Sequence, residues 1–116
     1  MRWLTLFITL LYVGCQPSYS QPELEFTPKS CEVAVYLAKR SLAMYRANND
    51  QFDVMVMLNN YDVSGNSEAY VGKVYTQVMA VDLKKNVYKA FKDEAIIKQF
   101  ATACTKRLGL KIPKGK

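Results

Sequence analysis

Three cysteines constrain the fold of this 116-residue chain more strongly than any other feature of its sequence. Cys31 and Cys104 lie far apart and enclose most of the chain, whereas Cys15 lies near the N-terminus. A disulfide between Cys31 and Cys104 would join the two ends of the folded part. Such bonds persist outside the reducing cytosol. Whether this one forms therefore depends on whether the N-terminal segment directs export.

The first 13 residues are typical of a secretory signal. Arg2 and the amino terminus give a positive start, and an apolar run from Trp3 to Val13 follows, interrupted only by two threonines. A run of this length is too short for a membrane-spanning helix, which needs about 20 apolar residues. We therefore expect an export signal rather than a membrane span or a buried helix of the mature domain.

Two processing sites are compatible with this signal. Residues 11–15 (LYVGC) resemble a bacterial lipobox, in which a small residue precedes an acylated cysteine. The resemblance implies a signal peptide of residues 1–14 and a lipidated Cys15. Because Gln16 replaces the aspartate of inner-membrane retention signals, it implies an outer-membrane lipoprotein facing the periplasm. The alternative is cleavage after Ser20, which gives a secreted soluble protein. Both routes leave the other two cysteines as one disulfide pair.

The mature chain begins with a linker. Residues 15–29 hold three prolines among polar residues, which predicts an extended segment rather than a packed element. Leu24 and Phe26 are the linker residues able to dock on the domain. A helical domain then spans residues 30–109, and a loose basic tail of residues 110–116 ends the chain.

The spacing of apolar residues predicts three long helices, because steps of three and four place them on one helical face. Val78 and Leu108 are among the residues expected to face the core. Gly72 lies inside the second helix, where glycine costs about 1 kcal/mol relative to alanine, and it predicts a close contact with another helix. Glu94 and Lys98 are spaced for an i,i+4 ion pair on the third. The predicted helices are residues 28–48 (or from Ser30), 67–86 and 93–108, with residues 87–91 as a connection.

Residues 51–59 fit both a strand and a short helix. Apolar residues alternate there as in a strand, but Phe52, Met55 and Val56 also follow helical steps, and Asp50 can cap a helix. We prefer the helix, because a lone strand would need a partner. The expected fold is therefore all-α: a small bundle of three long helices plus one short element, joined by one disulfide.

The segment from Cys31 to Cys104 resembles a group of small exported two-cysteine helical proteins of bacteria and phages. In that group a cysteine opens a first helix with Ala and Leu at helical spacing. A late helix of the type seen in residues 95–104 (AIIKQFATAC) carries the second cysteine. The resemblance implies the fold and the compartment, but no activity. A fainter likeness is to periplasmic acid-stress chaperones, which are small helical proteins with one disulfide.

The composition argues against an enzyme. The chain has no histidine, which excludes Ser-His-Asp and Cys-His catalysis and every zinc site that uses histidine. Three cysteines cannot form a Cys₄ site, and no glycine-rich phosphate-binding loop is present. We interpret the carboxylates as helix caps and the methionines as core residues. We therefore expect no catalytic residue, no metal and no cofactor.

The charge is unevenly distributed along the chain. From Lys84 to the C-terminus there are ten basic residues and two acidic ones, whereas acidic residues slightly outnumber basic ones before Lys84. Such asymmetry predicts a basic face. Because the chain is expected to be exported, we expect an acidic protein or an anionic envelope component as partner, and no nucleic acid. The candidate partner-binding residues are Tyr61 and Tyr88, which we expect on loops, together with Lys89, Lys92 and Lys98.

The sequence thus predicts a non-enzymatic exported binding protein, anchored to a membrane through a lipid on Cys15. It would bind or inhibit an acidic protein or envelope component, as immunity, exclusion or inhibitor proteins do. The alternative is a periplasmic stress chaperone or assembly factor that opens to expose its apolar faces.

Overall fold

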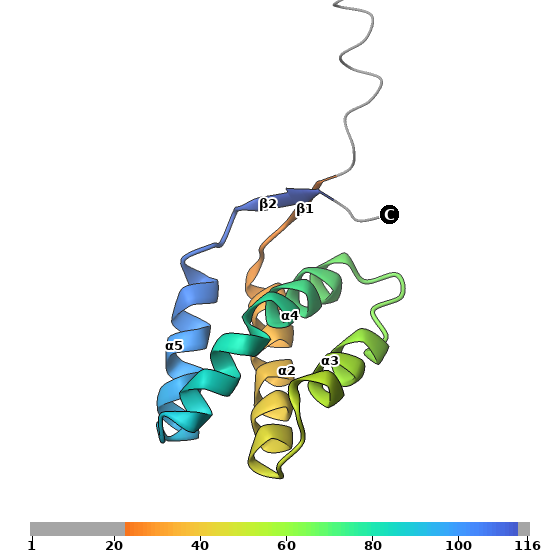
Figure 1. Cartoon of the computed structure of the whole chain (residues 1–116). Helices are drawn as coiled ribbons and strands as arrows, with labels where there is room; N and C mark the ends of the chain where they lie inside the picture. Colours follow the sequence, from red (N-terminus) through yellow and green to blue (C-terminus); the bar gives the residue numbers. More distant parts are fainter. Residues whose placement is uncertain (1–22, 114–116) are drawn as a thin grey trace, which may run out of the picture.

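The computed structural model describes residues 23–113 (Figure 1). Their elements are strand β1 (Glu23–Glu25), helices α2 (Pro28–Arg46), α3 (Gln51–Asn60), α4 (Ser67–Tyr88) and α5 (Asp93–Thr105), and strand β2 (Lys111–Pro113). The all-α bundle with three long helices and one shorter one is confirmed, and residues 51–59 lie in a helix. Within the described residues no helix has the length and hydropathy to span a membrane. The predicted signal peptide, Cys15 and the cut after Ser20 lie outside them.

Short polar side chains begin three of the four helices. The Thr27 side chain accepts a hydrogen bond from the backbone N–H of Ser30, and the Ser30 side chain accepts one in return, which forms a capping box. Asp50 and Asp53 form the same arrangement at α3, and Asn66 caps α4. These bonds satisfy backbone N–H groups that have no partner inside the helix. The start of α3 is therefore fixed locally, which explains why this segment is not a strand.

Helix α2 lies at the centre of the bundle and packs closely against α4 at Gly72. A Cβ atom at Gly72 would lie 2.5 Å from the backbone oxygen of Ser30 and 2.9 Å from Cβ of Val33. The predicted close contact at this glycine is confirmed. One turn later the buried Thr76 hydroxyl donates to the carbonyl of Gly72 over 2.8 Å and lies 3.3 Å from the carbonyl oxygen of Ala34. Small residues therefore let the two helix backbones approach each other.

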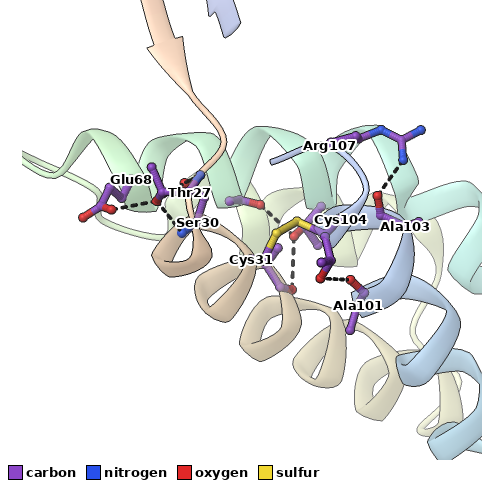
Figure 2. Close-up of a disulfide and its surroundings, with 12 residues drawn as sticks. Thr27, Ser30, Cys31, Glu68, Ala101, Ala103, Cys104 and Arg107 are labelled. Atoms are coloured by element: carbon purple, nitrogen blue, oxygen red, sulfur yellow. Dashed lines mark hydrogen bonds between the residues drawn. A yellow bond between two sulfur atoms is a disulfide. The ribbon is translucent and has the colours of Figure 1, made fainter. Parts of the chain in front are cut away.

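The predicted disulfide between Cys31 and Cys104 is confirmed, and it joins the first turn of α2 to the last turn of α5 (Figure 2). The two Cα atoms are 5.8 Å apart. Beside the bond, the ring of Tyr75 from α4 lies 5.7 Å from that of Phe26 and 5.1 Å from that of Phe100. The disulfide thus closes one end of the bundle over a buried aromatic cluster.

The two ends of the described segment form a small sheet that the sequence did not predict. Strands β1 and β2 pair antiparallel, with Leu24 opposite Ile112. The pairing continues inward, because the N–H of Phe26 donates to Leu110 O and the N–H of Gly109 donates to Phe26 O, both over 2.9 Å. Phe26 is 5% exposed, so docking by the end of the linker is confirmed. The expectation of a loose tail is wrong for residues 110–113.

Several details of the predicted helices are also wrong. Helix α4 extends to Tyr88 instead of ending near residue 86, and α5 ends at Thr105. Leu108 therefore follows the helix and is 42% exposed. Val78 is 72% exposed, because α4 buries other side chains, such as Thr76, Ala80 and Leu83. The predicted apolar stripe on α4 only partly coincides with its buried face.

Candidate functional site

A groove follows α5 and continues between α5 and the C-terminal half of α4. One part, of about 650 Å³, lies along α5 between Phe91 and Arg107. A second part, of about 380 Å³, lies between α4 and α5. Ile96, Gln99 and Ala103 line both parts, so the two adjoin each other along α5. Figure 1 shows α5 and the end of α4 meeting at the end of the domain opposite the two strands.

The floor of the groove is formed by two alanines of α5, with the polar residues Gln99 and Thr102 between them in the sequence. On the inner side of α5, Ile96, Phe100 and Cys104 are buried in the core. The residues one position away, Ala95 and Ala103, carry only a methyl group and line the groove. The hollow exists because these two side chains do not fill the space beside the helix.

Basic side chains surround this floor, and we call the whole feature the basic groove. Five cations and one carboxylate line its two parts. Four of the cations are exposed lysines, so their charges are available to a partner in solvent. The basic residues are Lys85, Lys89, Lys98, Lys106 and Arg107, and the acidic residue is Asp82.

Arg107 is fixed in place at one end of the groove. Its Nη1 donates to the carbonyl of Ala103 over 2.8 Å, as Figure 2 shows. Its guanidinium carbon also lies 5.5 Å from the centroid of the Tyr75 ring. A cation at this distance is attracted to the negative face of an aromatic ring. Arg107 therefore supplies a positive charge whose position the core defines.

Lysines at the groove are not neutralised by the ion pair that the sequence suggested. Among the described residues the one ion pair joins Arg46 to Asp93, with Nη2 and Oδ1 2.8 Å apart. Arg46 also donates to the carbonyl of Phe91, which ties the end of α2 to the start of α5. The expected Glu94–Lys98 pair is therefore not formed, and Lys98 lines the basic groove.

The structure brings together some of the predicted partner-binding residues. Lys89 and Lys98 both line the basic groove. Lys92 is exposed at the N-cap of α5, beside the groove rather than in it. Tyr88 lies in the last turn of α4 rather than on a loop, and it is 76% exposed. These four residues lie at the end of the domain where α4 connects to α5.

Tyr61 lies elsewhere. It is half-buried at the C-cap of α3, and its ring is 6.2 Å from that of Tyr36. Lys73 of α4 donates to its carbonyl over 3.1 Å. Lys73 and Tyr88 are separated by about 22 Å along α4, at a rise of about 1.5 Å per residue. Tyr61 is therefore not part of the surface that contains Tyr88 and the basic groove.

Sequence reasoning missed several residues of the basic groove. Lys85 and Lys106 belong to the basic C-terminal segment but are not among the predicted candidates, and neither are the alanines of the floor. The only available signal was the spacing of Ala95, Lys98, Thr102 and Lys106, which places them on one face of α5. That spacing does not indicate that this face of α5 is hollow.

The groups with shifted pKa values lie outside the basic groove. Three groups have shifted pKa values. Burial raises the pKa of Tyr45 and Tyr75, and hydrogen bonds from Ser64 lower the pKa of Asp62. None of these three lines the groove. Within the described part of the chain, no three His, Cys, Asp or Glu residues are grouped as a metal site would need.

Comparison with known proteins gives no relative, since no protein-family model, no curated protein and no solved structure matches this chain.

Proposed function

We propose that this protein is a non-enzymatic exported binding protein that holds an acidic protein or an anionic envelope component in the basic groove. The observation that carries the proposal is the ratio of five cations to one carboxylate around an apolar floor. Such a surface attracts an anionic partner at long range, and it gives that partner apolar area to bury on contact.

The covalent structure supports the export part of the proposal. A disulfide such as Cys31–Cys104 is typical of proteins in oxidising compartments. It agrees with the export signal that the first residues suggest, and with a lipid on Cys15 that would hold the domain at a periplasm-facing membrane. A small anchored domain that binds its partner without catalysing a reaction fits an immunity, exclusion or inhibitor role. In such a role, binding alone blocks the partner.

Capture from envelope extracts with charge-reversed variants tests this proposal. The groove variant carries Lys85→Glu, Lys89→Glu and Lys98→Glu. A control with the same change in net charge carries Lys29→Glu, Lys39→Glu and Lys111→Glu, at exposed positions outside the basic groove. We expect the wild type and the control to retain the same partner, and the groove variant to lose it. Equal capture by all three proteins would refute the assignment to the groove.

The mass of the intact mature protein tests export and anchoring independently. We expect the Cys31–Cys104 disulfide to account for two missing hydrogens, and an acylated Cys15 to be the first residue. A mass that begins at Gln21 would instead establish the soluble secreted form. An unprocessed precursor with free thiols in the cytosol would contradict the exported function altogether.

A further inference from the structure

The shape of the basic groove narrows the class of partner, on the premise of the binding function proposed above. The part along α5 is lined by α5 and its flanking residues, and the other part lies between α4 and α5. Exposed lysines line both parts, and the exposed Ala95 lines the part along α5. An elongated partner that follows α5 can contact this alanine and the lysines of both parts together. The groove therefore favours a single rod-like element that lies along α5.

The dimensions match one α-helix. The part along α5 is lined from Phe91 to Arg107, and α5 itself has 13 residues, which corresponds to about 20 Å. Packed helices lie with their axes 8–10 Å apart, and small side chains at the contact favour the closer approach. The methyl groups of Ala95 and Ala103 at the floor would permit such an approach by a partner helix.

The positions of the charges specify the partner further. Lys85 and Lys89 lie on the α4 side of the groove, about one helical turn apart. Lys98 and Lys106 lie along α5, about 12 Å apart. A complementary helix would therefore carry acidic residues on both flanks of an apolar stripe. Recognition of an amphipathic helix in a groove is an established mode of protein binding.

We infer that the basic groove receives one acidic amphipathic helix of a partner protein, with its apolar stripe on the Ala95–Ala103 floor and its carboxylates against the lysines on either side. Contact with the floor distinguishes this mode from general attraction between opposite charges. A substitution that fills the groove without changing its charge should therefore abolish binding. Ala95 is suitable for that substitution because it is exposed and lines the groove.

The test selects helices on the mature protein from a displayed library. The library presents a helix with a fixed leucine stripe and with Glu, Lys or Gln allowed at every flanking position. We expect the selected helices to carry Glu on both flanks. Their affinity should fall at least tenfold for the Lys85→Glu, Lys89→Glu, Lys98→Glu variant and for Ala95→Trp. It should not change for Ala43→Trp, which places the same side chain at an exposed position of α2 outside the groove.

A vesicle-binding assay distinguishes failure of the helical-partner inference from failure of the proposed binding function. Phosphatidylglycerol vesicles are offered to the same variants at low salt. Vesicle binding that depends on the three lysines, with no acidic helix selected, would overturn the helical partner but keep an anionic envelope component. Selected helices that tolerate Ala95→Trp would also overturn it. If helices, vesicles and captured partners are all insensitive to the groove variants, both proposals fail.

Discussion

Replacing Gly72 by alanine has two opposite effects on the stability of the folded protein. Alanine is favoured over glycine within a helix by about 1 kcal/mol. However, the added Cβ would lie 2.5 Å from the Ser30 carbonyl oxygen and 3.0 Å from the backbone nitrogen of Ala34. Both neighbours are backbone atoms of α2, which cannot rotate away as a side chain could.

The structure predicts that the steric effect is the larger. Relief of the contact requires α2 and α4 to separate, which also moves the carbonyl oxygen of Ala34 away from the Thr76 hydroxyl, 3.3 Å from it. Overpacking of a close-packed interior typically costs about 1–3 kcal/mol, and an immobile backbone neighbour argues for the upper part of this range or beyond. We therefore expect a net destabilisation of about 2 kcal/mol after the gain in helix propensity.

Urea unfolding of the oxidised protein, followed by circular dichroism, measures this change. A loss of about 2 kcal/mol corresponds to a fall of roughly 10 °C in Tm for a domain of this size. A peptide with the α4 sequence is the control, because it has no α2 to contact. Gly72→Ala should increase the helicity of the peptide. An unchanged or increased stability of the whole protein would refute the close contact of the two helices.

Three further predictions follow from the core. Replacing Cys31 and Cys104 together by alanine should lower the free energy of unfolding by about 4 kcal/mol in the chain-entropy model, measured by urea titration. A loss below about 1 kcal/mol would contradict the idea that the disulfide stabilises the domain by constraining the unfolded chain. Phe26→Ala should cost about 3–5 kcal/mol in the same assay because the ring is buried, and a negligible cost would show that the linker does not belong to the domain. Burial raises the pKa of Tyr45 and Tyr75, so both stay protonated above the pH at which the unfolded chain ionises, and stability should fall as the pH rises above about 10. Tyr75→Phe should reduce this loss of stability at alkaline pH and should cost little stability near pH 7, since the Tyr75 hydroxyl is buried without a hydrogen-bond partner. Tyr45→Phe should lower the free energy of unfolding by about 1 kcal/mol, because the Tyr45 hydroxyl donates to a carbonyl of α4.

The helices could be predicted because their signals are local. Apolar periodicity and capping residues such as Asp50 act within a few positions, so the helix at residues 51–60 could be preferred over a strand. The disulfide followed from counting cysteines in an expected export context. The fold class therefore needed no knowledge of distant contacts.

The two strands could not be predicted in the same way. Each has three residues, which is too short for a periodic pattern, and the partners Leu24 and Ile112 come from opposite ends of the chain. They meet because the disulfide and the Phe26 ring hold the two ends together. Strand pairing here depends on tertiary structure that local sequence does not encode.

The candidate site shows the same division. Lys89 and Lys98 could be chosen because charge accumulates in the C-terminal segment of the sequence. The part of the groove that Lys89 lines depends on how α5 lies against α4, and Ala95 resembles any other helical alanine in the sequence. Tyr61 was grouped with Tyr88 because both were expected on loops, and loop position says nothing about which end of the bundle a residue occupies.

The disulfide also defines how tension would travel through the molecule. A force applied at the N-terminal side would first load β1, where hydrogen bonds to β2 resist it, and would then reach Cys31 in the first turn of α2. From that sulfur the load would cross a covalent bond directly into α5, the helix along which the basic groove runs. Helices α3 and α4 lie outside this path. With the lipid anchor proposed above, a partner bound to α5 could therefore pull against the N-terminal side without loading α3.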